Sequence, residues 1–339
     1  MLALAHVSTS TLAAFLFAST TGSQTANASF RSLTSTTTAS TTLKRASSTP
    51  AALPVFTATT SVSVPGRPWP VSTLYPDAGA LLPFHRIVAY YGNFYSKQMG
   101  VLGQYPEEQV LAMLASTTAT WAAADPATPV IPAIQYIAVV AQAGAGKEGK
   151  YILRMPDSQV DHALAMADKM HGLLFLDIQV GQSTLQYELP QLEKYLAMPN
   201  VELAIDPEFS MKFGNAPGRV IGTYDAADIN YAAAYLASLV NANHLPPKIL
   251  VVHRFTEAMV TNYKDIRPLP EVQIVMDMDG WGSQAKKINT YKMVIAAEPV
   301  QFTGVKLFYK NDLLPPSTGM LTPAQVLSFT PAPIYIQYQ

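Results

Sequence analysis

Acidic side chains recur at one place in the pattern of this sequence, directly after short apolar runs. Asp177 and Asp206 each end such a run, Glu208 follows two residues after Asp206, and Asp277 and Asp279 end another. A carboxylate in this position costs free energy unless it is solvated, paired or used. Paired carboxylates can act as general acid and as base or nucleophile, so the pattern predicts acid–base chemistry.

The segments Asp206–Glu208 and Asp277–Trp281 are the most informative of these. Pro207 restricts the backbone, so that the acids on either side of it can face the same way. The spacing of Asp277 and Asp279 places both on one face of an extended strand. Trp281 could stack on a sugar ring or cover the end of a barrel. An aspartate after a strand also serves as a helix cap or turn residue, so each acid alone has a structural alternative.

Three further polar residues fall near the ends of apolar runs, namely Tyr91, Gln135 and His253. A histidine at the end of a run is either a hydrogen-bonded core residue or a group that transfers protons or binds a metal. Both interpretations of His253 stay open at this point. Tyr91 and Gln135 have side chains that could contact a polar substrate.

Eight apolar runs predict the strands that carry these residues. They cover residues 86–91, 130–136, 172–178, 201–206, 248–253, 272–277, 305–309 and 333–338. Near-continuous apolar runs are typical of parallel strands that are covered on both faces. Helical patterns lie between most of them, over 106–114, 157–170, 188–196, 225–240, 256–263 and, more weakly, 282–295.

Alternation of strands and helices over about 250 residues predicts an α/β fold, a (β/α)₈ TIM-type barrel. A doubly wound open sheet is the alternative. In a barrel the carboxyl ends of all strands converge on one face, where active sites are built. The fold would therefore bring the acids and His253 together.

Composition excludes several classes of protein. The 339 residues include no cysteine, which excludes disulfides, thiolate metal sites and a cysteine nucleophile. The net charge of −1 offers no basic footprint for nucleic acid. The charge is unevenly spread, because the first 76 residues contain four basic side chains and no acid, and the rest carries a net −5.

The N-terminal residues have the composition of an export signal and a linker. A short apolar run over 11–18 precedes Ala26-Asn27-Ala28, which fits a signal peptide over 1–28 and predicts a secreted protein. This run is too short to span a bilayer. Half of residues 29–64 are Ser or Thr, so we expect a disordered linker over 29–76 and a barrel domain over 77–339.

One nucleotide-binding motif is matched only in part. Residues Gly144–Lys150 fit G-x-x-x-x-G-K, but Tyr151 stands where Ser or Thr would bind magnesium. No convincing helix begins after it, and a phosphate cradle needs that helix N-terminus. We therefore predict a surface loop here.

Several segments of the chain resemble members of the glycoside-hydrolase-like (β/α)₈ barrel superfamily, and are most similar to uncharacterised secreted bacterial proteins of this type. These segments are Tyr90–Gly92, Gly100–Gly103, His171–Gly181, Val252–Thr256 and Met278–Gly282, and together they span most of residues 86–339. The resemblance implies the barrel more than a particular reaction.

The chain departs from the patterns of that superfamily at two positions. Retaining barrel glycosidases commonly place acids after the fourth and seventh strands, whereas here Glu208 follows the fourth and the seventh offers only Asp312. Chitinase-like barrels end one strand in Glu where this chain has Gln179. No complete catalytic signature is present.

Our leading hypothesis is a secreted, glycan-active hydrolase that needs no cofactor. Glu208 or Asp206 would donate the proton and Asp177 or Asp279 would be its partner. The residues expected to bind a carbohydrate or another small polar substrate are Tyr91, Gln135, His253, Asp277 and Trp281.

Two alternatives remain open. The first is a non-catalytic surface protein that binds a glycan or a partner. The second is a hydrolase in which Asp177, Asp206, Glu208, His253 and Asp279 hold a divalent metal ion. The sequence does not identify the oligomeric state.

Overall fold

A computed structural model of the protein describes residues 76–339. The signal peptide expected over 1–28 and nearly all of the linker expected over 29–76 lie outside the described residues.

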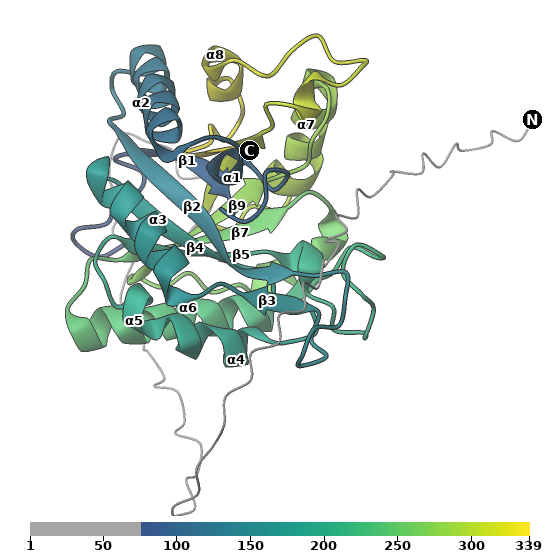
Figure 1. Cartoon of the computed structure of the whole chain (residues 1–339). Helices are drawn as coiled ribbons and strands as arrows, with labels where there is room; N and C mark the ends of the chain where they lie inside the picture. Colours follow the sequence, from purple (N-terminus) through teal and green to yellow (C-terminus); the bar gives the residue numbers. More distant parts are fainter. Residues whose placement is uncertain (1–75) are drawn as a thin grey trace, which may run out of the picture. The chain divides into compact units, whose positions relative to one another are not determined.

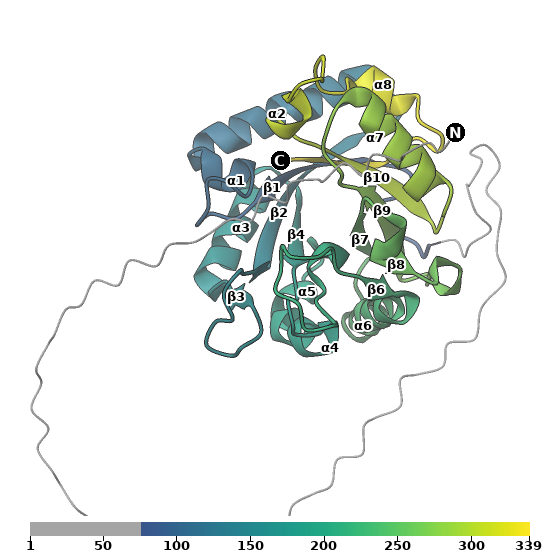
Figure 2. The same ribbon diagram turned by 90° about the vertical axis from the view of Figure 1, so that its right-hand side faces the viewer.

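Eight parallel strands form a closed barrel, which Figure 2 shows with helices α2, α3, α6 and α7 outside it. The strands, in their order around the barrel, are β1 (Arg86–Gly92), β2 (Val130–Ala141), β4 (Leu173–Ile178), β5 (Val201–Ile205), β7 (Lys248–Arg254), β9 (Val272–Met278), β10 (Phe302–Leu307) and β11 (Tyr335–Tyr338). Closure comes from β1, which pairs in parallel with both β2 and β11. The predicted barrel is confirmed, and the open sheet is wrong.

Three short strands lie outside the barrel. Strand β3 (Ile152–Arg154) pairs antiparallel with the end of β2, and β6 (Tyr224–Asp225) pairs with β8 (Val260–Thr261). Residues 144–150, which match the nucleotide motif in part, form turns and bends between β2 and β3. The prediction of a loop is confirmed there.

The helices follow the strands as expected of this fold (Figure 1). They are α1 (Val101–Gln104), α2 (Glu107–Ala124), α3 (Asp157–Lys169), α4 (Leu185–Glu188), α5 (Glu193–Leu196), α6 (Ala226–Asn243), α7 (Gln284–Thr290) and α8 (Pro323–Leu327). Short 3₁₀ turns are η1 (Leu189–Leu192), η2 (Pro207–Phe209), η3 (Glu257–Met259), η4 (Tyr263–Asp265) and η6 (Asn311–Leu313), and η5 (Tyr291–Ala296) is a π-helical extension of α7.

Local sequence explains where the long helices begin. Pro106 precedes α2, and Glu107 and Glu108 occupy its first turn, where negative charge favours the helix dipole. Helix α6 begins with a capping box in which the side chains of Asp225 and Asp228 satisfy each other's backbone groups.

The helix predicted over 256–263 is wrong. The chain there forms η3, β8 and the start of η4 instead. The buried guanidinium of Arg254 donates to the backbone carbonyls of Thr256, Glu257 and Val260, at 3.3, 2.8 and 3.2 Å. Carbonyls held in this way are not available for a regular helix.

Two apolar layers surround the strands. The outer layer joins the strands to the helices, and it includes Trp121 and Leu236. The inner layer fills the barrel, and Leu82 closes its N-terminal end beneath Phe175 and Val251. Gln273 fixes this closure, because its amide binds the backbone of Leu81 and Leu82.

None of the helices within residues 76–339 has the length and apolarity needed to cross a membrane.

Candidate active site

The inward faces of β4, β7 and β9 each end in a polar residue that follows an apolar one. Inward residues on three strands are Leu173, Phe175 and Asp177 of β4, Ile249, Val251 and His253 of β7, and Gln273, Val275 and Asp277 of β9. Alternate residues of a strand share one face. The predicted site residues therefore continue the inner layer at the end of the barrel where active sites are built.

His253 lies at the centre of this polar group. Its Nε2 is 2.9 Å from Oδ2 of Asp177, and its Nδ1 is 3.3 Å from Oδ2 of Asp277 and 3.5 Å from Oδ2 of Asp279. Both Asp177 and Asp277 are fully buried. One imidazole ring thus lies close to three carboxylates, one from β4 and two from the end of β9.

These carboxylates determine the charge of His253. Burial disfavours the imidazolium, but the attraction of Asp177, Asp277 and Asp279 outweighs it and holds the pKa of His253 well above its usual value. These acids therefore favour the protonated form of His253.

A chain of hydrogen bonds extends from Asp177 across the barrel. Gln135 donates its amide to Oδ2 of Asp177 at 2.6 Å, and its Oε1 accepts from the hydroxyl of Tyr335. Gln337 donates to the same hydroxyl at 3.3 Å. These fully buried groups hold Asp177 in place beneath the more exposed acids.

Gly304 provides the space for this packing. A Cβ atom at Gly304 would lie 2.6 Å from Oδ1 of Asp277 and 3.0 Å from Cδ1 of Tyr335. The close approach of these side chains to β10 needs a residue without a side chain.

A second set of side chains lies nearer the barrel mouth. Gln179 donates its amide to the hydroxyl of Tyr91 and to Oδ2 of Asp206, both at 3.4 Å. The ammonium of Lys306 lies over the ring of Tyr91, 3.6 Å from its centroid. These side chains are 3% to 4% exposed.

Asp206 and Glu208 are brought together by the 3₁₀ turn η2. Asp206 caps this turn, because its Oδ1 accepts from the backbone N–H of Glu208 at 3.0 Å. Asp206 is thus the cap of a turn, which is the structural alternative named above for such acids. Its Oδ2 also accepts from the amide of Gln179. The side chain of Glu208 is half-buried.

The environment of both acids favours their protonated forms. Burial raises the pKa of Asp206 to about 7, where repulsion by Asp279 and Asp177 is offset in part by His253 and Lys306. Burial, followed by repulsion from Asp206 and Asp279, raises the pKa of Glu208 to about 8. Burial also raises the pKa of Asp279, against the attraction of His253 and Lys306. Such shifts are characteristic of functional sites.

Eight of the nine predicted site residues meet at this end of the barrel. They are Tyr91, Gln135, Asp177, Asp206, Glu208, His253, Asp277 and Asp279. Trp281 is separate, since it is 41% exposed and its ring lies beneath the ammonium of Lys286, 4.8 Å from the centroid.

Asp312, the acid after the seventh strand, binds the loops rather than the site. Its oxygens accept from the backbone N–H groups of Gly282 and Phe308, both at 2.9 Å, and it pairs with Lys287 at 3.2 Å.

Sequence reasoning missed Lys306, Tyr335 and Gln337 as members of the site, and it treated Gln179 only as a departure from a family pattern. A signal for them exists, because each is a polar residue at inward parity on a buried strand or just after one.

Among the residues that the structure describes, no group of three or more His, Asp or Glu side chains is arranged to hold a metal ion.

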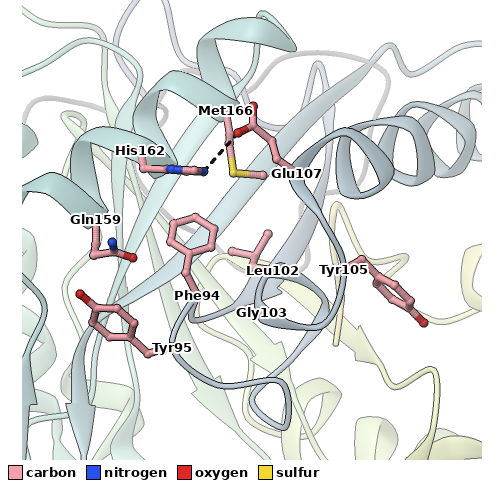
Figure 3. Close-up of a pocket in the computed structure, with 9 residues that line it drawn as sticks. All are labelled: Phe94, Tyr95, Leu102, Gly103, Tyr105, Glu107, Gln159, His162 and Met166. Carbon is pink, nitrogen blue, oxygen red and sulfur yellow. Dashed lines mark ion pairs between the residues drawn. The ribbon is translucent and has the colours of Figure 1, made fainter.

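A separate cavity of about 330 Å³ lies outside the barrel (Figure 3). The ring of Phe94 stacks on Tyr136 at 4.7 Å and packs against His162, whose Nε2 lies 3.3 Å from a carboxylate oxygen of Glu107. None of the predicted site residues lines this cavity.

No family model and no curated protein sequence matches the chain. Among solved structures, the chain is similar to GH26C from Muricauda sp. MAR_2010_75, with 11% sequence identity and a TM-score of 0.32. The match covers 79% of this chain and 76% of that chain. The strand pairing within this chain itself shows the closed barrel.

Proposed function

We propose that the protein is a hydrolase that cleaves glycosidic bonds at the carboxyl end of its barrel. The arrangement that carries this proposal is the cluster of acids at the mouth, in which Oδ2 of Asp279 lies 3.5 Å from Nδ1 of His253 and burial raises the pKa of the partly buried Glu208 to about 8. Glycoside hydrolysis needs one carboxylic acid that keeps its proton and one carboxylate that has lost it.

Glu208 is the better proton donor of the two candidates. Burial raises its pKa to about 8, so it keeps its proton at neutral pH, and its side chain is only partly buried. Asp206 has one carboxylate oxygen on the backbone of η2 and the other on Gln179. Asp206 therefore acts mainly by raising the pKa of Glu208.

Asp279 is the better partner. It is 8% exposed, whereas Asp177 is fully buried and hydrogen-bonded to both Gln135 and His253. Burial raises the pKa of Asp279, and the cation on His253 acts against that shift. The ionised form of Asp279 would be the base or nucleophile. Tyr91 and Gln179 would orient the substrate, and Trp281 would contact a more distant sugar.

The test is product release from a panel of polysaccharides by the wild-type protein and by Glu208→Gln. We expect the variant to lose at least about a hundredfold in kcat, because removal of a general acid costs that much. Glu257→Gln is the matched control, since Glu257 is exposed and lies in the loop after β7. Equal rates for wild type and Glu208→Gln would contradict the proposal.

A non-catalytic glycan-binding role is the second candidate. The low exposure of Tyr91, Asp206 and Asp279, at 4%, 3% and 8%, limits the access of a scissile bond to these side chains and so counts against cleavage. Binding to a glycan array without product release, unchanged in Glu208→Gln, would support this role. A metal-dependent reaction would need several ligands around one ion, an arrangement that is lacking in residues 76–339.

We also propose that the protein is exported. The apolar run over 11–18 and the Ala26–Ala28 segment carry this proposal. Sequencing of the N-terminus of the exported protein should begin close to Ser29, and an intact Met1 would contradict it.

A further inference from the structure

Three lysines are buried in the described part of the chain, and two of them have close partners. Lys248 donates its ammonium to the carbonyl of Val201 at 2.7 Å. Lys287 donates to two carbonyls, at 2.8 and 2.6 Å, and pairs with Asp312 at 3.2 Å. A buried ammonium normally has such partners, because its charge is costly to remove from water.

Lys306 is the exception. It is 4% exposed, and within residues 76–339 its ammonium has no hydrogen bond to the protein and no carboxylate oxygen within 4.0 Å. The nitrogen is not among the fully enclosed atoms that lack a partner, so solvent still touches it. Its close contacts are the rings of Tyr91 and Phe308, whose centroids lie 3.6 and 5.3 Å away. A ring face attracts a cation but accepts none of its three N–H groups in a conventional hydrogen bond.

The position of Lys306 directs it into the site. It shares the inward face of β10 with Phe302 and Gly304, one step nearer the mouth than Gly304. Its charge acts on Asp206, Glu208 and Asp279 by lowering their pKa values. The ammonium therefore faces the same space as the two proposed catalytic acids.

The carboxylates of the site lie much closer to His253 than to Lys306. Three carboxylates lie within 3.5 Å of His253, and none in the described residues lies within 4.0 Å of Lys306. If Lys306 served only to neutralise these acids, its flexible four-carbon stem would allow a direct pair with one of them. Its donors instead remain available to a ligand.

We propose that Lys306 binds an anionic group of the substrate, and that the site takes an acidic glycan whose sugar carries a carboxylate, a uronic acid. This inference rests on the proposed function, and it adds the substrate class. A sulfate ester on a sugar would present similar oxyanion chemistry, so the experiment includes both anions.

The test is the affinity of the full-length protein for D-glucuronate, D-glucose and glucose 6-sulfate, measured by calorimetry. Glucuronate and glucose differ only at C6, where one has a carboxylate and the other a CH₂OH group. We expect glucuronate to bind at least about tenfold more tightly than glucose, because a charge-assisted hydrogen bond in a buried site is worth that factor. Tighter binding of the sulfate than of glucuronate would overturn the assignment of a uronic acid.

Variants of Lys306 test whether the preference for glucuronate depends on this lysine. Lys306→Gln and Lys306→Met should abolish the preference for glucuronate, and thermal unfolding shows whether each variant is folded. Lys310→Gln is the matched control, since Lys310 is exposed in the loop that follows β10. A folded Lys306→Gln protein that still prefers glucuronate, or a wild type that binds both sugars equally or neither, would overturn the proposal.

The outcomes separate this inference from the proposed function. If the protein hydrolyses neutral glycans in a reaction that depends on Glu208, but does not bind glucuronate, the proposed hydrolase function stands and the proposed uronic acid substrate is wrong. Glucuronate binding that depends on Lys306, without hydrolysis of any polysaccharide, would support the acidic ligand and contradict the hydrolase.

Discussion

At the scale of single residues, the site depends on how a few buried charges share partners. His253 lies within 3.5 Å of Asp177, Asp277 and Asp279. No lysine, arginine or histidine nitrogen of the described residues lies within 4.0 Å of the two acids of the η2 turn, whose pKa values burial raises to about 7 for Asp206 and about 8 for Glu208. Carboxyl groups with different environments can play opposite roles in one reaction. Glu208 is suited to be the acid, and Asp279 the base or nucleophile.

The activity of the proposed hydrolase should have an alkaline limit set by Glu208. Because Glu208 must carry a proton, kcat should fall about tenfold for each pH unit above its pKa of about 8. Asp279 must be ionised, so the rate should also fall at acid pH. Initial rates from pH 4 to 10 measure this profile, and a rate that stays constant through pH 9 would rule out Glu208 as the acid.

Replacement of His253 should destabilise the fold. His253→Gln leaves three buried carboxylates without their cation, and we expect a loss of about 3 kcal/mol in the free energy of unfolding at pH 6. The folded-state pKa of His253 is raised, so its contribution is complete below pH 6.5 and is lost as pH rises through that pKa. The deficit of the variant should therefore shrink at alkaline pH.

Urea denaturation at pH 6 and at pH 9 measures this effect. His171→Asn is the control, because His171 is exposed and its φ of 49° suits asparagine. A deficit that is equal at both pH values would show that His253 acts by packing and not by charge.

At the scale of elements, the site is positioned by the alternation of side chains along each strand, because every second residue faces the interior of the barrel. Inward residues of β4, β7 and β9 change from apolar to polar at the carboxyl end, and Gly304 on β10 leaves room for Asp277 and Tyr335. A side chain on this strand at residue 304 would disturb the hydrogen bonds below the acids that we propose to be catalytic.

Gly304→Ala should therefore destabilise the protein by about 1–3 kcal/mol, the usual cost of overpacking a core. Gly144→Ala is its control, because a Cβ atom there would meet no atom within 4 Å. Chemical denaturation compares the two variants. Equal stabilities would mean that the neighbours of Gly304 can move aside without cost.

Sequence patterns predicted the strands better than the loops. All eight barrel strands coincide with apolar runs, and the acids that follow them lie together because parallel strands share one carboxyl end. The helix expected over 256–263 is wrong, since the guanidinium of Arg254 binds three backbone carbonyls of that segment, a contact that hydrophobic periodicity does not reveal. Lys306 was missed because only acids, histidine and residues at the ends of the apolar runs were considered, although its parity on the strand is that of the inward-facing residues.

At the scale of the whole molecule, function depends on closure of the barrel. The last strand, β11, is the link, because it pairs with both β1 and β10 and carries Tyr335 and Gln337 into the site. The residues that meet at the mouth come from strands that an open sheet would hold far apart.

A chain that ends at Ala332 should fail to fold cooperatively. It would leave β1 and β10 without a common neighbour and would expose apolar residues such as Ile336, which is fully buried. Circular dichroism during thermal unfolding, compared with the full chain, tests this. A cooperative transition at the temperature of the full chain would show that closure does not contribute to stability.

The central claim is that the carboxyl group of Glu208 is a proton donor at neutral pH, and its titration tests this claim most directly. Carbon-13 NMR of the intact protein labelled at glutamate carboxyls would follow each signal with pH, and the signal missing from Glu208→Gln would identify the residue. We predict a midpoint at about 8 for Glu208. A midpoint near the ordinary value of 4.5 would contradict the account, because Glu208 would then have no proton to donate.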